Sequence, residues 1–411
     1  MEYGLIGEKL NHSFSEPIHK LLGGYDYELK CLLPQELPSF FEKRDFKGLN
    51  ITIPYKKTVI EYCKNLSPEA QRIGSVNTIT VEADGSLTGH NTDYAGFLYM
   101  AGRAGISFEG KKVLILGTGG TSLTAAAAAQ DSGAREIVTT SRKGEVNYEN
   151  IYQHNDSNII INTTPVGMYP KNGERLIDIK KFSNCSGIID VIYNPLKTSL
   201  LLEAEMLRIP YTNGLPMLVA QAKYANDLFL GAQTSEDRIE PVLKQMLRSM
   251  MNITFVGMPG SGKTTVGRLT AQLLGRKFID TDELIEQQTE MTIEEIFEAL
   301  GEDNFRSIES GIVAQACREL GAVIATGGGS ILNPKNTQAI RQNSFVVHLE
   351  RELDSLDTVG RPLSAGQDSL GALWQQRHMI YQSICDYKPE DDIPIEIAQE
   401  VVRRFNENSC Y

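Results

Sequence analysis

Short apolar runs alternate with segments of helical periodicity along the whole chain. Apolar runs rich in β-formers predict strands in the first half at residues 3–6, 50–53, 76–81, 112–116, 136–142, 158–162 and 187–191. In the second half, such runs predict strands at 253–256, 278–279, 322–325 and 345–349. Helical patterns lie between them at 36–44, 58–63, 123–131, 217–230, 241–250, 293–300 and 305–320. This alternation predicts an α/β fold throughout.

A β-turn-α-β pattern begins at Lys112. The apolar strand runs into Gly117-Thr-Gly119-Gly120, an Ala-rich helix follows, and the next strand ends at Ser141-Arg142. This is the pattern of a Rossmann dinucleotide-binding unit, in which a glycine-rich turn brings pyrophosphate to a helix N-terminus. The alternative is a purely structural βαβ turn, since Ser122 stands where the third glycine would fall. Because cations follow the second strand and no carboxylate does until Glu145, the pattern favours NADP(H) over NAD.

A second nucleotide motif lies in the middle of the chain. Residues 257–264 match G-x-x-x-x-G-K-[ST], with an apolar strand before them and a helical pattern after them. We expect phosphate binding by Gly260, Ser261, Gly262, Lys263, Thr264 and Thr265. Lys263 would reach the outer phosphates and the Thr264 hydroxyl would hold Mg²⁺. A nucleotide-binding domain therefore begins near residue 250.

Size and composition agree with two soluble domains. A chain of 411 residues is too long for a single core. The net charge of −12, without a basic run, argues against a nucleic-acid partner. The six cysteines have no metal-ligand spacing, which predicts free thiols in a reducing compartment. The sequence has neither a signal peptide nor a membrane-length apolar span, so we expect a cytoplasmic protein with small-molecule partners.

Three polar groups precede the first glycine-rich turn. Ser13 and Ser15 are two residues apart and could bind one carboxylate, Lys56 follows a strand, and Asp93 follows Asn91. Hydride transfer to a ketone needs a proton donor for the developing alkoxide, and a lysine held by an aspartate can serve. Each group also has a structural alternative: a solvated lysine, a helix N-cap or turn serines.

The polar residues of the second half suit phosphoryl transfer, which depends on positioning and cations. Asp280 and Asp282 follow the second strand of this domain, and alternation along a strand predicts that both face one side. Arg306 and Glu309 are one helical turn apart, and the glycines 327–329 permit close approach to a ligand. A surface ion pair and a flexible loop are the structural alternatives.

Residues 1 to about 247 resemble shikimate dehydrogenase. The resemblance rests on His12-Ser13-Phe14-Ser15, Asn50-Ile-Thr52-Ile-Pro54-Tyr-Lys56, Val76-Asn77-Thr78, Asn91-Thr92-Asp93, the Gly117–Gly120 turn, Ser141-Arg142, residues 162–168, Tyr193 and residues 214–222. It implies that Lys56 and Asp93 form the acid–base pair. It also implies that the substrate is held by Ser13, Ser15, Thr52, Asn77, Tyr193 and Gln221. The cofactor residues implied are Gly117, Gly119, Gly120, Ser141 and Arg142, with Gly214 and Met217 beside the nicotinamide.

Residues 251–411 resemble shikimate kinase. The phosphate loop, Asp280-Thr-Asp282, Phe305-Arg306-x-x-Glu309, the triple glycine, Arg361-Pro362-Leu363 and Arg377-x-x-x-Tyr381 carry the resemblance. It implies that shikimate is bound by Asp282, Arg306, Gly328 and Arg377, with the two arginines on its carboxylate. Lys263 and Asp282 would be catalytic, Thr264 and Asp280 would hold Mg²⁺, and Arg361 would reach the nucleotide phosphates. The second half contains no N-K-x-D element, so ATP is expected.

Together these observations predict a fusion of two enzymes. Residues 1–249 would form the dehydrogenase, with a substrate lobe (about 1–100 and 215–249) and a Rossmann NADP lobe (about 101–214). Residues 250–411 would form a P-loop kinase domain related to the nucleoside monophosphate kinases. We expect NADPH-dependent reduction of 3-dehydroshikimate, followed by ATP-Mg²⁺-dependent phosphorylation of shikimate. The alternatives are a quinate-preferring dehydrogenase, a kinase for another small polyol, or one degenerate half with a regulatory role.

Overall fold

The computed structural model describes residues 1–10, 13–353, 356 and 367–408. The chain divides into two compact units. The first comprises Met1–Val166, Arg175–Tyr193 and Glu203–Met246, and the second comprises Gly167–Glu174, Asn194–Leu202 and Leu247–Tyr411. Two short segments of the predicted first half are thus grouped with the second unit. None of the described helices is both long enough and apolar enough to cross a bilayer.

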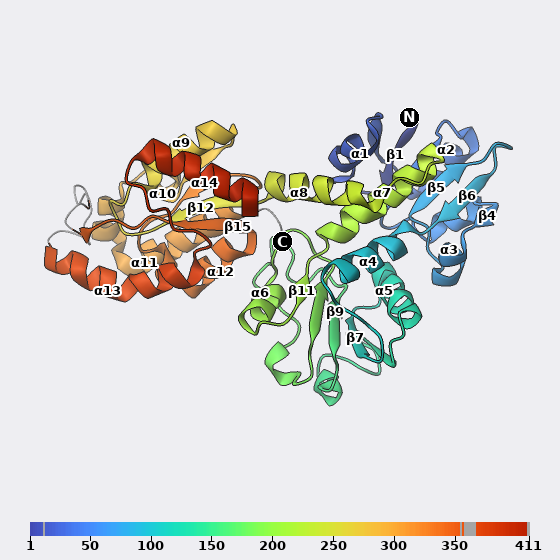
Figure 1. Ribbon diagram of the computed structural model, residues 1–411, viewed down its shortest axis with the longest axis horizontal. Helices are drawn as coiled ribbons and strands as arrows, with labels where there is room; N and C mark the ends of the chain where they lie inside the picture. The colour runs from blue at the N-terminus through green and yellow to red at the C-terminus, as the bar shows by residue number, and fades with distance from the viewer. Residues whose placement is uncertain (11–12, 354–355, 357–366, 409–411) are drawn as a thin grey trace. The chain divides into compact units, whose positions relative to one another are not determined.

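The first lobe of the first unit is built on a six-stranded mixed sheet. Its strand order is β2 (Tyr27–Cys31), β1 (Tyr3–Gly7), β3 (Gly48–Ile51), β5 (Thr78–Val81), β6 (Leu87–His90) and β4 (Asn65–Leu66). Its helices are α1 (Ser15–Gly23), α2 (Leu37–Lys43), α3 (Pro68–Ile73), α4 (Thr92–Arg103), α7 (Leu215–Leu230) and α8 (Ile239–Met250). Figure 1 shows α4 and α7 side by side, and they pack against each other. Because α4 leads to the second lobe and α7 returns from it, this pair joins the two lobes.

The second lobe has a five-stranded parallel sheet. Its order is β11 (Tyr211–Thr212), β10 (Gly187–Asp190), β9 (Ile159–Asn162), β7 (Lys112–Leu116) and β8 (Glu136–Thr140). From β7 the chain adds β8 on one side, and it then adds β9, β10 and β11 on the other side. Open α/β sheets bind their ligands at such a switch point, which here lies between β7 and β9. Helix α5 (Gly120–Asp131) starts at this edge, and its buried residues Ala125, Ala128 and Ala129 let it pack closely on the sheet. Helix α6 (Ser199–Met206) precedes β11.

The second unit contains a four-stranded parallel sheet. Its order is β13 (Phe278–Asp280), β14 (Val323–Ala325), β12 (Asn252–Val256) and β15 (Ser344–His348). The helices that accompany it are α9 (Lys263–Leu274), α10 (Thr281–Thr289), α11 (Ile293–Cys317), α12 (Pro334–Asn343), α13 (Gln367–Ile384) and α14 (Pro394–Asn408). Only Met251 lies between the end of α8 and the start of β12.

The α/β fold predicted from the periodicity is confirmed, and two local expectations need correction. Residues 58–62 form a 3₁₀ helix instead of an α-helix. The strand β13 ends at Asp280, and Asp282 belongs to the first turn of α10, so strand alternation does not place the two carboxylates. The reason is that Asp280 caps α10: its side chain accepts hydrogen bonds from the backbone N–H groups of Asp282 and Glu283.

Candidate active sites

A cavity of about 310 Å³ opens in the first unit and is lined by both lobes. The first lobe contributes residues that follow β1 and β3, together with residues of α4 and α7. The second lobe contributes the start of α5 and the segment after β10. Ten of the residues proposed from the sequence line this one cavity: Ser13, Ser15, Thr52, Lys56, Asn77, Asp93, Tyr193, Gly214, Met217 and Gln221. His12 lies outside the described residues.

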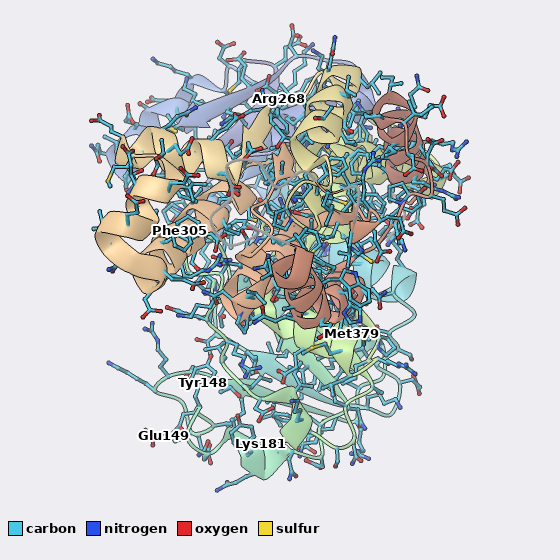
Figure 2. The ribbon with its side chains drawn as sticks, turned by 90° about the vertical axis from the view of Figure 1, so that its left-hand side faces the viewer. Tyr148, Glu149, Lys181, Arg268, Phe305 and Met379 are labelled. Carbon is cyan, nitrogen blue, oxygen red and sulfur yellow. The ribbon has the colours of Figure 1, made fainter. Side chains whose placement is uncertain are left out.

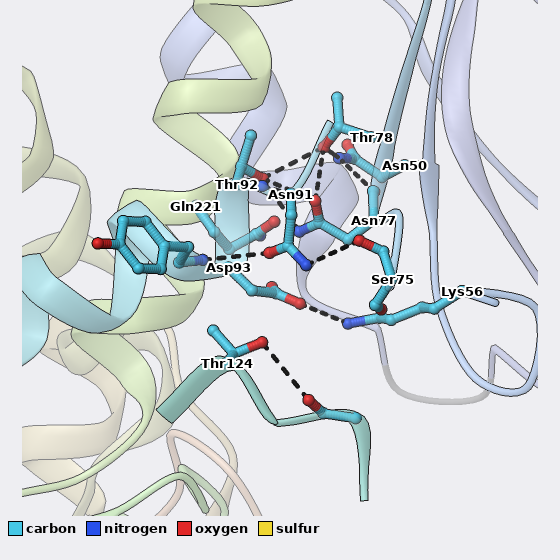
Figure 3. Close-up of polar contacts among 12 residues, drawn as sticks. Asn50, Lys56, Ser75, Asn77, Thr78, Asn91, Thr92, Asp93, Thr124 and Gln221 are labelled. Carbon is cyan, nitrogen blue, oxygen red and sulfur yellow. Dashed lines mark hydrogen bonds and ion pairs between the residues drawn. The ribbon is translucent and has the colours of Figure 1, made fainter. Parts of the chain in front are cut away.

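Lys56 and Asp93 form an ion pair on the wall of this cavity. The Lys56 ammonium lies 2.6 Å from Oδ2 of Asp93, and the two side chains are 24% and 14% exposed. Figure 3 shows them pointing toward one another from a turn after β3 and from the first turn of α4. The helix is capped by Asn91, whose side chain accepts from the Tyr94 N–H, so Asp93 is not the N-cap. The Asp93 carboxylate is therefore available to hold the ammonium.

A buried hydrogen-bond network fixes the start of α4, and with it Asp93. Asn77 accepts from the Thr92 N–H at 2.7 Å and donates to the Thr92 hydroxyl at 3.0 Å (Figure 3). Asn50 donates to the Thr78 hydroxyl and accepts from Tyr27 at 2.7 Å. Asn77 thus has a structural role beside its place on the cavity wall. No local pattern predicts this role, because the residues of the network come from three different strands and a helix.

The remaining polar side chains of the cavity surround the ion pair. The Ser13 hydroxyl accepts a hydrogen bond from the backbone N–H of Ser15 at 3.2 Å, which keeps the two serines close together. Gln221 donates to the Leu218 carbonyl at 2.9 Å. The ring of Tyr193 meets Phe14 edge-on at 5.9 Å, and burial raises the pKa of its hydroxyl, so Tyr193 stays a neutral donor. Several donors and one ammonium suit a small hydroxylated anion.

The glycine-rich turn after β7 has the geometry of an anion cradle. Gly117 has a φ of +110°, and a Cβ there would lie 2.8 Å from the Thr163 hydroxyl, so only glycine fits. Gly119 caps α5 without a side-chain hydrogen bond, and a Cβ on Gly119 or Gly120 would meet open space. Ser122 donates to the Gly119 carbonyl at 2.7 Å and so tightens the turn. The backbone N–H groups at the helix start remain suited to a pyrophosphate.

Ser141 and Arg142 follow β8, next to this turn. The two strand ends are adjacent, since Gly117 donates from its N–H to the Thr140 carbonyl at 2.8 Å. Arg142 is exposed, and neither residue lines the cavity that holds Lys56 and Asp93. An exposed cation at the end of the second strand of such a unit is suited to a ribose 2′-phosphate.

A second cavity, of about 670 Å³, lies in the second unit. It is lined by the phosphate loop, the start of α10, both parts of α11, the triple glycine and α13. The residues proposed from the sequence that line it are Gly260, Gly262, Lys263, Thr264, Thr265, Asp280, Asp282, Arg306, Gly328 and Arg377. Ser261 is buried behind the loop, and Arg361 lies outside the described residues.

The phosphate loop is folded for an anion. Gly262, with a φ of +91°, is the N-cap residue of α9, and no side chain caps the N–H groups of the helix start. The Lys263 ammonium donates to the carbonyls of Gly257 at 2.9 Å and Met258 at 2.8 Å and so spans the loop. The buried Ser261 hydroxyl has no hydrogen-bond partner among the residues described. The helix start and the Lys263 ammonium together suit the phosphate groups of a nucleoside triphosphate.

Thr264 and Asp280 form a candidate Mg²⁺ site. The Thr264 hydroxyl donates to Oδ2 of Asp280 at 2.7 Å, which brings the two predicted ligands together. In the part of the chain that the structure describes, no group of three or more His, Cys, Asp and Glu side chains is arranged so that it could hold a metal ion by itself. Mg²⁺ often uses one or two protein ligands, with phosphates and water completing its shell, so this pair fits the ion.

Two arginines, Arg306 and Arg377, line this cavity. Arg306 binds Glu309 at 2.9 Å through Nη1 and Glu302 at 3.1 Å through Nη2. Arg377 is only 2% exposed, and its Nε has no hydrogen-bond partner within the described ranges. Burial and the nearby Arg306 lower the pKa of Arg377. An anionic ligand would accept a hydrogen bond from the Arg377 Nε and offset the repulsion between the two guanidinium groups, so the pair is suited to a carboxylate.

The structure adds residues to this site that the sequence did not single out. Phe305, labelled in Figure 2, packs against Phe297 with their ring centroids 4.5 Å apart, and both line the cavity. Ser330 donates to Oε1 of Glu309 at 2.7 Å, which holds the carboxylate that orients Arg306. An apolar wall could have been anticipated from the Phe next to Arg306, whereas the Ser330 contact could not.

Comparisons with known proteins assign the two parts separately. The family model described as the shikimate dehydrogenase substrate binding domain matches residues 5–79, and that of shikimate kinase matches residues 259–406. A shikimate dehydrogenase (NADP(+)) from Clostridium perfringens is 33% identical over 265 residues, which are 59% of this chain and 97% of the relative. A shikimate kinase from Symbiobacterium thermophilum is 41% identical over 170 residues, 38% of this chain and 98% of the relative.

A solved structure agrees with the first assignment. The chorismate mutase/shikimate 5-dehydrogenase fusion protein from Clostridium acetobutylicum matches with a TM-score of 0.57 and 33% identity. The match covers 59% of this chain and 96% of that protein.

Proposed function

We propose that this chain, which belongs to the shikimate dehydrogenase family over its first part and to the shikimate kinase family over its second, catalyses two consecutive reactions. The first is the reduction of 3-dehydroshikimate with NADPH and a proton, which yields shikimate and NADP⁺. The second is transfer of the γ-phosphoryl group of ATP to the 3-hydroxyl of shikimate, which yields shikimate 3-phosphate and ADP. The chain is thus a bifunctional enzyme of the shikimate pathway.

In the dehydrogenase cavity, NADPH supplies the hydride when it is bound. Ser13 and Ser15 bind the substrate carboxylate, and Thr52, Asn77, Tyr193 and Gln221 bind its hydroxyl groups. The Lys56 ammonium donates a hydrogen bond and then a proton to the carbonyl oxygen as negative charge develops there. Asp93, 2.6 Å from the ammonium, keeps that donor in place.

Cofactor choice depends on the turn after β7 and on the end of β8. Gly117, Gly119 and Gly120 receive the pyrophosphate, and Ser141 and Arg142 bind the 2′-phosphate. Gly214 and Met217 carry the nicotinamide. In support, Gly214 and Met217 line the same cavity as Lys56 and Asp93.

In the kinase cavity, ATP with Mg²⁺ supplies the phosphoryl group when it is bound. The loop residues Gly260–Thr265 bind its phosphates, with Lys263 on the outer ones, while Thr264 and Asp280 hold the metal. Arg306 and Arg377 bind the shikimate carboxylate, and Gly328 contacts its ring through the backbone. Asp282 accepts the proton of the attacking hydroxyl, and Arg361 completes the phosphate site.

One observation carries this proposal: in each unit, the side chains expected to touch substrate line a single cavity together with the expected phosphate or nicotinamide residues. A degenerate half would have lost this arrangement, and neither described cavity has lost it. Two coupled assays on the full chain test the proposal. NADPH oxidation at 340 nm follows the reduction, and ADP release follows the phosphorylation.

The alternatives differ in their preferred substrate. The proposal expects kcat/KM for shikimate oxidation to exceed that for quinate, and kcat/KM with NADP⁺ to exceed that with NAD⁺. Phosphorylation should require shikimate and fail with quinate. A dehydrogenase that prefers quinate, or a kinase half that ignores shikimate, would rule out the assignment for that half.

A further inference from the structure

Tyr381 is a buried residue that joins two parts of the kinase cavity. It lies on α13, one helical turn after Arg377, and is 1% exposed. Its hydroxyl donates to the backbone carbonyl of Gly328 at 2.5 Å. Tyr381 does not itself line the cavity, whereas Arg377 and Gly328 both do. One side chain therefore ties the helix that carries Arg377 to the middle of the triple glycine.

The triple-glycine segment is closely surrounded by functional groups. A Cβ on Gly327 would lie 2.6 Å from Oδ1 of Asp282, and a Cβ on Gly328 would lie 2.6 Å from Cδ of Pro259 in the phosphate loop. A Cβ on Gly329 would lie 2.5 Å from Nη1 of Arg306. The contacts of the two outer glycines are with Asp282 and Arg306, which are proposed to bind the acceptor, so a shift of this segment by a few tenths of an ångström would change both contacts.

The two ends of the segment are held by other residues. The Gly327 N–H donates to the Thr281 hydroxyl at 3.0 Å. At the other end, the Ser330 hydroxyl binds Glu309, which in turn binds Arg306. The middle residue is held through its carbonyl by Tyr381. The orientation of the peptide between Gly328 and Gly329 is thereby fixed, since the Gly329 N–H points the opposite way from the Gly328 carbonyl in this planar unit.

The ring of Tyr381 is itself rigidly packed. It stacks on the buried His348 ring with centroids 5.0 Å apart and an interplanar angle of 21°. Both belong to the interior, and Tyr381 also packs in the apolar cluster that contains Val256 and Val346. Because Tyr381 is 1% exposed, a phenylalanine ring would keep this packing, and the Gly328 carbonyl would lose the donor that the phenol supplies.

We propose that Tyr381 is a positioning residue for the phosphoryl acceptor, acting through Gly328 and Arg377. Its hydroxyl holds the Gly328 backbone in position relative to Arg306 and Arg377. Shikimate can then place its carboxylate on the two arginines and its ring on Gly328 at the same time. This inference rests on the proposed kinase function. It assigns Tyr381 to the acceptor side of the cavity only, because the nucleotide phosphates are bound by the separate loop at residues 260–265.

The test is Tyr381→Phe in the full-length chain. This change removes one oxygen and keeps the ring that packs on His348. The matched control is Tyr387→Phe, which removes a phenol hydroxyl elsewhere in the same unit, away from the cavity. Shikimate binding is read from the fluorescence of Trp374, the only tryptophan of the sequence, which lies on α13 next to the lining residue Leu373. Steady-state kinetics give KM for shikimate and for ATP separately.

We expect Tyr381→Phe to raise KM and Kd for shikimate by about 5- to 15-fold, the effect of one lost buried hydrogen bond. KM for ATP, the melting temperature of the second unit and the dehydrogenase rate should stay close to wild type. Tyr387→Phe should change neither KM. The variant Arg377→Lys should weaken shikimate binding as well, and its effect should not add to that of Tyr381→Phe, since both act on one ligand contact.

An unchanged shikimate KM in Tyr381→Phe would overturn the inference. Equal losses of ATP and shikimate affinity, or a failure of the variant to fold, would also overturn it, because the role would then be structural. A different result would contradict the proposed function itself: a wild-type chain that neither binds nor phosphorylates shikimate.

Discussion

Replacement of Asp93 by Asn isolates the ion pair at the centre of the dehydrogenase cavity. The change keeps the size of the side chain and removes the charge that faces the Lys56 ammonium at 2.6 Å. The helix start should be preserved, because Asn91 caps α4 and Asn77 binds the Thr92 backbone. The variant therefore tests the charge of Asp93 and leaves the fold intact.

The expected loss follows from the geometry. At 2.6 Å, and with an effective dielectric constant of about 20, the attraction between Lys56 and Asp93 is about 6 kcal/mol before desolvation is subtracted. The net value of such a charged hydrogen bond is about 1.5–3 kcal/mol, which corresponds to about 10- to 150-fold in rate. A Lys56 ammonium that is no longer held in place is also a poorer general acid, and a positioned acid or base contributes about 10²- to 10⁴-fold to the rate. We therefore expect kcat to fall by about 1,000-fold.

The assay is NADPH oxidation with 3-dehydroshikimate, with phosphorylation of shikimate measured on the same preparation. The control Asp84→Asn breaks another lysine–aspartate pair of the same lobe, the exposed contact with Lys64, and should leave kcat unchanged. The double variant with Lys56→Ala should be no slower than the slower single variant, because the two side chains act as a unit. A loss smaller than about threefold for Asp93→Asn would refute this account of the pair.

Three further outcomes are expected. Lys263→Ala should abolish phosphorylation and leave the dehydrogenase rate within about twofold; loss of both activities would contradict two independent sites. Glu302→Gln should lower KM for shikimate by about twofold, because this 55% exposed carboxylate competes for Arg306, and a higher KM would show instead that it orients the arginine. Burial lowers the pKa of His19 to about 3 and of His348 to about 4, so each unit should lose at least about 2 kcal/mol of stability between pH 7.5 and pH 5 as the unfolded histidines become protonated. Urea unfolding at the two pH values measures this loss. His19→Gln should reduce the loss in the first unit only, and part of it should remain because burial also lowers the pKa of His90.

The sign of the pH effect comes from the unfolded state. An unfolded histidine binds a proton near pH 6.5, whereas the buried His19 and His348 stay neutral until about pH 3 and about pH 4. Their contribution to stability is therefore complete above about pH 6.5 and declines below it. Stability that does not change between pH 7.5 and pH 5 would contradict the burial of these two rings.

Periodicity predicted the architecture because parallel strands buried on both faces leave clear apolar runs. The run 253–256 and the phosphate loop after it are adjacent in sequence, so local pattern alone was sufficient there. The gap expected between helices at residues 300 and 305 corresponds to Gly301, whose φ of +78° and ψ of 170° kink α11. The predicted helical segments did not include α4, although α4 carries Asp93 in its first turn. They also omitted α1, α3, α6, α10, α12, α13 and α14.

The sites depend on contacts that no local pattern encodes. Lys56 and Asp93 are 37 residues apart, and Tyr381 and Gly328 are 53 apart. Family resemblance suggested the first pair, and nothing in the sequence suggested the second. Asp280 shows the opposite case: its place after a strand was anticipated, but its role as the cap of α10 was not, because capping depends on where the strand stops.

The most direct test of the two-step account uses the purified full-length chain. It is supplied with 3-dehydroshikimate, NADPH, ATP and Mg²⁺, and the products are identified by mass. We expect shikimate 3-phosphate, with one NADP⁺ and one ADP formed for each molecule of product. Shikimate that accumulates without a phosphorylated product, or dehydroshikimate that remains unreduced, would contradict the claim that both cavities act on the same ring acid.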